Sequence, residues 1–241
     1  MKYQIFLILF LSPIVLGQMP VKKFIIWNIG QGQWTSLVQE GECQHFDAGG
    51  EFFPLKNILA TCHSIQEFHL SHWDHDHING LYRIFQSPQI CMHLPLINKK
   101  LSPRKQLLIN KFKQCNNKDS FVIYRPRLHS SMSTNATSTV FQISNQILIP
   151  GDSPVSEERK WIPSIKSPQQ VRILILGHHG SRTSTSLELL DALPNLKLAV
   201  SSARIKRFGH PHIEVLQKLK AKKIPILRTE EWGNIGFELN F

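Results

Sequence analysis

Five titratable side chains lie within six consecutive residues of this chain, in the segment "HWDHDH": His72, Asp74, His75, Asp76 and His77. Packing alone rarely gathers so many imidazoles and carboxylates, because none of them buries well without a partner. Divalent metal ions prefer such anionic oxygens and neutral imidazole nitrogens, and a bound cation removes the cost of burying the charges. The cluster therefore predicts a metal site, and a merely solvated polar loop is the alternative.

The spacing within the cluster suits ligands. His72, Asp74 and Asp76 alternate, so that together with His77 they can turn inward from a tight loop that enters a helix. Two metal ions roughly 4 Å apart would use five or six such ligands and would stabilise both the attacking and the leaving oxygen of a hydrolytic displacement. The segment therefore favours hydrolysis at a binuclear metal site.

Three other segments carry candidate residues. "IPGDSP" contributes Asp152, which is either a turn residue or a carboxylate bridging two metal ions. "LGHHGS" contributes His178 and His179; we expect these neighbours to point in opposite directions, so that one is a ligand and the other supports a ligand or contacts the substrate. "FGHPHI" places His210 and His212 at a helix start, where backbone N–H groups favour anions, with simple capping as the alternative.

Each of these clusters must be positioned by the element before it. Short apolar segments over 67–70, 146–150 and 171–176 end directly before the first cluster, Asp152 and the His pair. Because rigid strands position the loops that follow them, the three clusters could converge on one edge. We expect strands over 22–29, 34–39, 43–47, 67–70, 138–144, 146–150, 171–176, 196–202, 224–229 and 234–241, and helices over 78–85, 102–115, 184–193 and 212–223. Residues 138–150 predict a hairpin that turns at Asn145, and the whole pattern predicts two sheets covered by helices.

The composition is that of a folded, basic protein. The chain has 241 residues, 41% hydrophobic and 19% charged, which excludes a disordered chain and suits one domain with a real core. Lysine and arginine number 28 against 17 acidic residues, a formal net charge of +11. Such a surplus points to a polyanionic partner such as nucleic acid or an anionic membrane surface, or else serves solubility alone.

The N-terminal residues read as an export signal. An apolar run from Ile5 to Leu16 follows Lys2 and ends before Gly17, so we expect residues 1–17 to be a signal peptide and 18–241 the mature hydrolase domain. The protein would then be periplasmic or extracellular, or membrane-anchored if the segment is not cleaved; the mature chain carries no other run of membrane length. The four cysteines allow three pairings, and we expect buried free thiols.

The motifs in this order carry a family resemblance. "SHWDHDHINGL", "PGD", "HHGS" and "GHPH" resemble the metallo-β-lactamase superfamily. Within it the chain looks like the soluble hydrolase domain of ComEC-type DNA-uptake proteins, because "NIGQGQ", "HFDAGG", "NATSTV" and "RTEEWGNIGFEL" are similar to further elements of that domain. The resemblance runs from about residue 22 to 241 and implies an αββα sandwich, two mixed β-sheets flanked by helices, with the metal site at one edge.

The chain also departs from the family pattern. Asp74 stands where the superfamily's commonest motif has a second His, and this harder ligand makes Mn²⁺ a rival of Zn²⁺. Asn28 and Gln33 replace acidic residues, and Asn135 and Ser138 stand where a third ligand His is usual. The membrane channel of ComEC-type proteins has no counterpart in this sequence.

The resemblance implies roles for the candidate residues. Of two divalent metal ions, Zn or Mn, one would be held by His72 and Asp74 and the other by Asp76 and His77, with Asp152 bridging and His178 or His179 completing the second site. Hydroxide formed from a water of lowered pKa would attack phosphorus, with Asp74, Asp76 or Asp152 taking the proton and His210 or His212 assisting the departing oxygen. The expected substrate-binding residues are Asn135, Ser138, Ser181, Arg182, Lys206 and Arg207.

The expected activity is hydrolysis of phosphodiester bonds in single- or double-stranded DNA. Since this fold hosts many substrates, a small-molecule phosphodiesterase, esterase or lactonase is the first alternative. A non-catalytic DNA-binding module with a structural metal site is the second.

Overall fold

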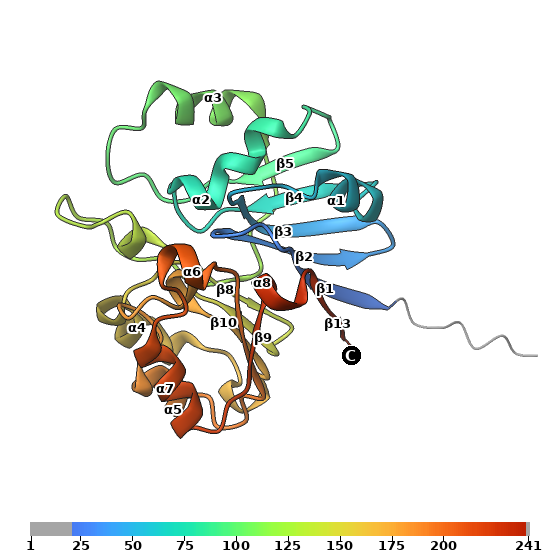
Figure 1. Cartoon of the computed structure of the whole chain (residues 1–241). Coiled ribbons are helices and arrows are strands. Elements are labelled where there is room, and N and C mark those ends of the chain that lie inside the picture. Colours follow the sequence, from blue (N-terminus) through green and yellow to red (C-terminus); the bar gives the residue numbers. More distant parts are fainter. Residues whose placement is uncertain (1–20, 240–241) are drawn as a thin grey trace, which may run out of the picture.

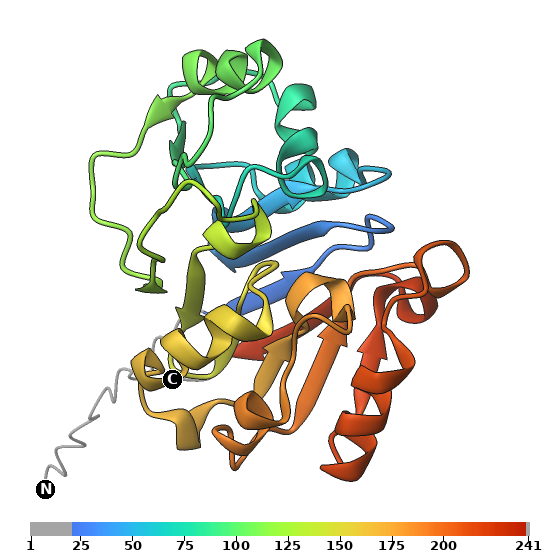
Figure 2. The same cartoon turned by 90° about the vertical axis from the view of Figure 1, so that its left-hand side faces the viewer.

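A computed structural model describes residues 21–239, and over this range the strands form two sheets that pack face to face (Figures 1 and 2). The first sheet has the order β13-β1-β2-β3-β4-β5-β6 and the second β12-β11-β10-β9-β8-β7. Helices cover the outer face of each sheet, which makes the αββα sandwich that the sequence predicted. The predicted signal peptide, residues 1–17, lies outside the described residues.

The strands and helices have the following bounds. The first sheet comprises β1 Lys22–Ile26, β2 Gln33–Gln39, β3 Glu42–Gly49, β4 Gln66–His69, β5 Ile90–His93, β6 Lys113–Gln114 and β13 Ile235–Leu239. The second comprises β7 Val122–Tyr124, β8 Val140–Ile143, β9 Ile147–Ile149, β10 Ile173–Ile175, β11 Leu198–Ser201 and β12 Ile226–Arg228. The helices are α1 Leu55–Thr61, α2 His75–Ile78, α3 Pro103–Lys111, α4 Val155–Trp161, α5 Leu187–Asp191, α6 Ile205–Phe208, α7 Ile213–Ala221 and α8 Thr229–Trp232.

Strand alternation builds the core in layers. Successive strand residues point to opposite faces, so in β9 Ile147 and Ile149 face the first sheet while Leu148 faces the outer helices. The layer between the sheets is made mainly of Ile and Phe side chains. A second layer packs α4, α5 and α7 on the second sheet, and a third packs α1, α2 and α3 on the first. The rigid sandwich fixes the strand ends from which the polar loops leave.

Several predicted elements are confirmed and some differ in extent. The hairpin is present, since β8 and β9 pair antiparallel and turn through Ser144 and Asn145, both with positive φ. The predicted helix over 102–115 begins as expected at Ser102, whose hydroxyl accepts a hydrogen bond from the Lys105 N–H, but it ends at Lys111. The next residues pair with β5 as the short strand β6. Residues 78–85 form the end of α2 and a 3₁₀ turn instead of a regular helix.

The expectation of free thiols is wrong. Cys43 is bonded to Cys62 and Cys91 to Cys115, and the part of the chain that the structure describes has no free cysteine. Both bonds lie on the first sheet and its connections: one joins β3 to the end of α1, the other joins β5 to the residue after β6. Sequence separation could not reveal these pairs because each joins two different elements that only the fold brings together.

Parallel pairing decides where the polar loops leave the sandwich. Strands β3, β4 and β5 run parallel in the first sheet, and β9, β10 and β11 run parallel in the second. In such sheets ligands bind in the crevice beyond the carboxyl ends of the strands. The loop after β4 and the loops after β9 and β10 meet there, which is the edge that the sequence predicted. Among residues 21–239, no helix is both long enough and apolar enough to span a bilayer.

Candidate metal centre

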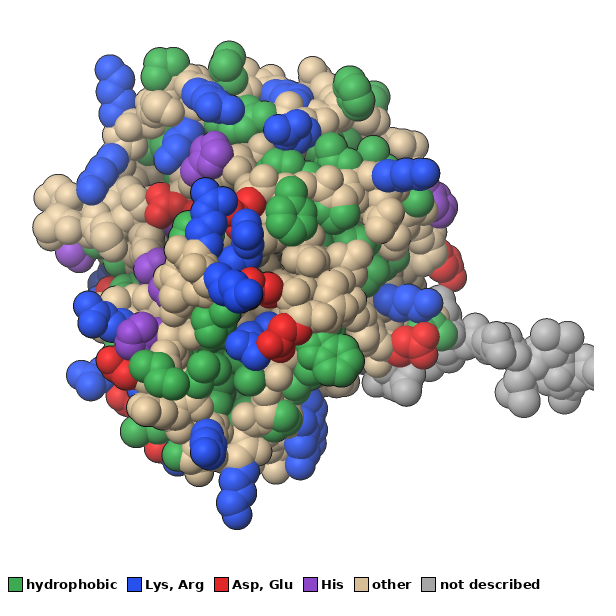
Figure 3. All heavy atoms as spheres, viewed as in Figure 1, with side chains coloured by type: hydrophobic (Ala, Val, Ile, Leu, Met, Phe, Trp, Pro, Cys, Tyr) green, Lys and Arg blue, Asp and Glu red, His purple; other side chains and the backbone are tan. Residues whose placement is uncertain are grey.

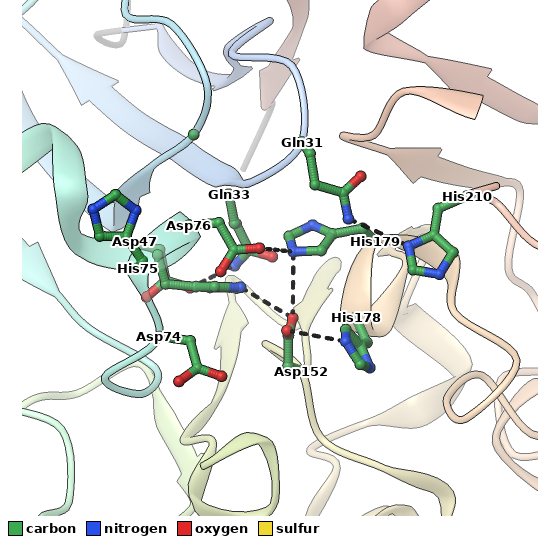
Figure 4. Close-up of polar contacts among 12 residues, drawn as sticks. Gln31, Gln33, Asp47, Asp74, His75, Asp76, Asp152, His178, His179 and His210 are labelled. Atoms are coloured by element: carbon green, nitrogen blue, oxygen red, sulfur yellow. Dashed lines mark hydrogen bonds and ion pairs between the residues drawn. The ribbon is translucent and has the colours of Figure 1, made fainter. Parts of the chain in front are cut away.

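Asp152 lies at the centre of the converging side chains (Figure 4). Its Oδ1 is 3.1 Å from His77 Nε2 and 3.8 Å from His179 Nε2. Its Oδ2 is 3.6 Å from His178 Nε2 and 3.8 Å from His72 Nε2. One buried carboxylate, from the loop after β9, thus faces imidazoles from the loops after β4 and β10.

The two other carboxylates of the first cluster lie beside these imidazoles. Asp76 Oδ2 is 3.2 Å from His179 Nε2, and Asp74 Oδ2 is 3.5 Å from His72 Nε2. His75 is exposed, and its Nδ1 lies 3.1 Å from the Asn79 amide nitrogen, so this ring is turned away from the others (Figure 4). The loop "HWDHDH" therefore directs every titratable side chain except His75 toward one point.

The donor set fits divalent cations. Two groups of three side chains in this site, His72–His77–Asp152 and Asp76–His77–His179, have donor atoms within 4.8 Å of one another. His72 Nε2, His77 Nε2 and Asp152 Oδ1 are buried and find no hydrogen-bond partner among the described residues. Two ligands about 2.0 Å from a tetrahedral ion lie about 3.3 Å apart, close to the N–O distances here. Buried polar atoms without partners are costly, and a cation would satisfy all of them.

Asp47 supports the centre from behind, a role that the sequence reasoning did not assign. This buried carboxylate at the end of β3 accepts hydrogen bonds from the backbone N–H and the hydroxyl of Ser71, each at 2.7 Å, and from Gln33 Nε2 at 3.0 Å. Its Oδ2 also lies 2.7 Å from His77 Nδ1, which fixes that ring with Nε2 toward Asp152. The available signal was the Asp-Gly of "HFDAGG", but nothing in the spacing tied it to His77.

Ser138 supports Asp152. Its hydroxyl accepts a hydrogen bond from the Asp152 backbone N–H at 3.1 Å, and the residue is only 1% exposed. Ser138 was expected to bind substrate, and the structure places its hydroxyl on the backbone of Asp152.

The His pair departs from its expected geometry. Adjacent side chains were expected to point in opposite directions, and this is wrong, because His178 and His179 both adopt left-handed backbone angles, with φ of 48° and 56°, and both face Asp152. Asn135 Nδ2 lies 3.2 Å from His178 Nε2. Asn135 stands where the family pattern usually has a histidine, and the structure brings the imidazole of His178, from another loop, next to it.

His210 and His212 separate in space. His210 Nδ1 lies 3.2 Å from Gln31 Nε2, and its ring centroid is 6.0 Å from that of His178, so it borders the centre. His212 caps α7 through its Nδ1, which accepts a hydrogen bond from the Glu214 N–H at 3.3 Å. The capping alternative therefore describes His212, while His210 faces the site.

The carboxylates of the centre are held in their charged form. Burial alone would raise the pKa of Asp152, but the His77 and His179 charges outweigh it and hold that pKa well below its usual range. Burial likewise opposes ionisation of Asp76, whose pKa is nevertheless lowered by the hydrogen bond from His179 and by the charge of His77. Burial lowers the pKa of His178 and of His210, which keeps both rings neutral. Burial would lower the pKa of His77, but the Asp152 and Asp47 charges raise it well above its usual value, so this ring is charged when no cation is bound. Metal ions bind ionised carboxylates and neutral imidazoles, and a bound cation would therefore displace the His77 proton.

The remaining predicted contacts lie around the rim. Ser181 is buried with its hydroxyl 3.0 Å from Thr183 Oγ1, whereas Arg182 is exposed. Lys206 and Arg207 lie on α6, where Lys and Arg side chains gather around acidic ones (Figure 3). Arg207 forms an ion pair with Glu51. These residues surround the centre without contacting its carboxylates.

Close backbone approach explains the glycines of the first sheet's loops. A Cβ on Gly49 would lie 2.4 Å from the Asp76 carbonyl carbon, and one on Gly32 would lie 2.8 Å from the Asp76 oxygen. Only glycine lets the "GQGQ" and "DAGG" segments pack directly against the backbone of the "HWDHDH" loop.

Comparisons with known proteins extend these observations. No protein-family model matches the chain. It is 23% identical to Competence protein ComA of Neisseria gonorrhoeae over 228 residues, and this match covers 89% of this chain and 32% of that protein. Recombination protein 2 of Haemophilus influenzae is 25% identical over 226 residues, 86% of this chain and 28% of that protein. ComE operon protein 3 of Bacillus subtilis is 37% identical over 75 residues, 31% of this chain and 9% of that protein. The chain thus spans about a third or less of the length of these curated relatives.

Solved structures share the architecture. The metallo-beta-lactamase fold protein YhfI of Bacillus subtilis superposes with a TM-score of 0.55 at 13% identity, covering 90% of this chain and all of that one, 100%. A diphosphatase of the PhnP family superposes with a TM-score of 0.50 at 12% identity, covering 91% and 98%. The chain therefore has the metallo-β-lactamase fold, and its sequence resembles competence proteins.

Proposed function

We propose that this protein is a metal-dependent hydrolase that cleaves phosphodiester bonds of DNA at a binuclear centre. The observation that carries the proposal is the convergence of three loops on Asp152, where several buried imidazole and carboxylate atoms form no hydrogen bond with the described residues. The similarity to competence proteins supports DNA as the substrate class.

The contacts favour one division of ligands. Asp76, His77 and His179 would hold one ion, since they form one group of neighbouring donors. His72, Asp74 and His178 would hold the other, and Asp152, which faces both sets, would bridge. In this arrangement His178 supplies the imidazole that the sequence lacks at Asn135, its neighbour. The donor set of nitrogens and carboxylates suits Zn²⁺ or Mn²⁺.

The surrounding residues supply the rest of the chemistry. Bound divalent cations would polarise the phosphodiester and lower the pKa of a water molecule. Asp74, whose side chain is 34% exposed, can accept a proton from attacking water. Gln31 donates to Nδ1 of His210, so a neutral His210 carries its proton on Nε2 and can donate it to a developing negative oxygen.

Export is a further part of the proposal. Disulfides form and persist in oxidising compartments, and two are present here. Together with the signal-like residues 1–17, they support a periplasmic or extracellular protein. Mass spectrometry of the chain recovered outside the cytoplasm should give a mature N-terminus at Gln18.

The test of the activity is direct. Purified protein is stripped with a chelator, reloaded with Mn²⁺, Zn²⁺ or Mg²⁺, and incubated with labelled single- and double-stranded DNA. We expect cleavage with at least one metal, and its loss in Asp152→Asn, while Asp191→Asn, at a side chain 59% exposed on α5, retains it. Turnover of a small phosphodiester without DNA cleavage would replace DNA by a small-molecule substrate. Metal-independent DNA binding without any turnover would favour a binding module.

A further inference from the structure

Glu51 occupies an unusual position for an acidic residue at the rim of a site proposed to bind DNA. Its carboxylate is 16% exposed and forms ion pairs with Arg204, at 3.3 Å, and with Arg207. The second oxygen also accepts a hydrogen bond from the Gln31 backbone N–H at 2.9 Å. Glu51 follows β3 of the first sheet, whereas both arginines follow β11 of the second, so these ion pairs join loops of the two sheets.

A pocket joins this ion-pair cluster to the metal centre. It encloses about 410 Å³ and is lined by Gln31, Gly50, Glu51, His75, Asp76, Asn79, Arg207 and Phe208. Asp76, a proposed ligand, forms one wall, and Phe208 and Arg207 form another. A group bound in this pocket would therefore lie beside the reacting phosphate.

The two arginines are suited to a phosphate. A guanidinium presents a planar fork of N–H donors that matches carboxylate and phosphate oxygens alike. Here two guanidiniums share a single carboxylate, which leaves one positive charge uncompensated within the cluster. A phosphate can reach these donors in place of Glu51, because the Arg204 and Arg207 side chains are 41% and 60% exposed whereas the carboxylate is 16% exposed.

Phe208 gives the pocket an apolar face. Its side chain is 41% exposed, and the Arg207 guanidinium carbon lies 5.1 Å from the ring centroid. An exposed aromatic ring beside a guanidinium is an arrangement with which proteins stack unpaired bases. In duplex DNA both faces of a base are covered by neighbouring pairs, so only an unpaired nucleotide could use this ring.

We propose that the pocket binds an unpaired nucleotide next to the scissile bond, with its base on Phe208 and its phosphate on Arg204 and Arg207 in place of Glu51. The inference rests on the proposed function and specifies its substrate class as single-stranded DNA. In the absence of DNA, the Glu51 carboxylate then occupies the position of the phosphate and forms the ion pairs with both arginines.

The first experiment measures the aromatic contact. Cleavage of a labelled single strand and of the same sequence as a duplex is compared in the metal-loaded full chain, in Phe208→Ala and in Trp232→Ala, a matched change at an aromatic residue 67% exposed on α8. We expect the single strand to be preferred, and Phe208→Ala to raise KM for it by roughly tenfold while Trp232→Ala does not. Equal cleavage of duplex, or an unchanged KM in Phe208→Ala, would overturn the proposal.

The second experiment tests Glu51. In Glu51→Gln the amide oxygen still accepts from the Gln31 N–H, but the arginines lose their counter-charge. We expect single-stranded DNA to bind roughly three- to fivefold more tightly to this variant than to the unchanged chain. If Glu51 only braces the two halves, Glu51→Gln instead lowers the melting temperature and weakens binding.

The outcomes separate this inference from the proposed function. If no DNA of any form is cleaved with any metal, the proposed function fails. If DNA is cleaved but neither variant shifts KM or affinity in the stated direction, the nucleolytic function stands and the pocket is not the nucleotide subsite.

Discussion

At the scale of single residues, the centre depends on a fully buried carboxylate behind the converging side chains, that of Asp47. Asp47 receives hydrogen bonds from Ser71 and Gln33 and lies 2.7 Å from His77 Nδ1. Such a carboxylate fixes the ring tautomer that leaves Nε2 free for a ligand bond. The orientation of His77 is therefore set by a residue thirty positions earlier in the chain.

Replacing Asp47 should weaken metal binding without removing a ligand. In Asp47→Asn we expect metal affinity to fall roughly ten- to a hundredfold, because His77 loses its charged partner. Competition with a chromophoric chelator measures the affinity, and Asp191→Asn serves as the control. An affinity equal to that of the unchanged chain would exclude this supporting role.

His45 should make the fold sensitive to acid. Burial lowers the pKa of this histidine from 6.5 to about 3, although its bond to Gln66 opposes the shift. Between those two values the unfolded chain binds a proton that the folded chain does not, so stability is complete above pH 6.5 and is lost as the pH falls toward 3. The loss should approach about 1.4 kcal/mol per pH unit.

Urea unfolding in the presence of a chelator, at several pH values, measures this dependence. We expect His45→Gln to show a shallower decline in the unfolding free energy than the unchanged chain, and His63→Gln, at an exposed position, to match the unchanged chain. Parallel curves for His45→Gln and the unchanged chain would refute the assignment.

At the scale of elements, short strands depend on covalent links and on pairing. Strand β6 has two residues, Lys113–Gln114, and the Cys91–Cys115 bond joins its end to β5. The helix pattern over 102–115 misled the sequence prediction here because pairing with β5 outweighs local helix propensity over its last residues. The hairpin of β8 and β9 was predictable because alternation and turn chemistry are local.

Removing the disulfide between Cys43 and Cys62 should destabilise the first sheet but spare the metal centre. The bond closes a separation of 19 residues, so the double change to Ala should lower the free energy of unfolding by about 3 kcal/mol. Thermal melting measures the loss, and metal content by mass spectrometry should stay that of the unchanged chain. An unchanged melting temperature, or loss of bound metal, would contradict the prediction that this disulfide stabilises the sheet and not the metal centre.

At the scale of the whole molecule, the basic side chains behind the net charge of +11 have different roles. On α7, Lys218 donates to the Thr185 carbonyl and Lys222, next after the helix, pairs with Asp191, so part of that basic face serves the fold. Arg207, by contrast, lies beside the pocket that opens on Asp76. The surplus that matters for DNA is therefore expected near α6 and not along α7.

The salt dependence of DNA binding should show this distribution. Each phosphate neutralised contributes about 0.7 to the slope of log affinity against log salt for single strands. We expect Arg207→Ala to reduce the slope by roughly that amount, and Lys220→Ala, on α7, to leave it unchanged. Anisotropy titrations at several salt concentrations give both slopes; equal slopes for all three proteins would exclude Arg207 as a phosphate contact.

The sequence by itself determined which histidines and aspartates gather, and at which edge of the sandwich they do so. "HWDHDH", "PGD" and "HHGS" each follow an apolar strand, and strand ends are positions that local patterning predicts. The αββα fold expected from those motifs is confirmed by the architecture and by the superposition with YhfI.

Only the tertiary structure decided how those residues are arranged. That Asp47 orients His77, that both His178 and His179 face Asp152, and that the cysteines pair all depend on contacts between segments far apart in the chain. Local patterns encode period and turn type, whereas a left-handed backbone at two histidines or the packing of one loop on another is set by the sandwich as a whole.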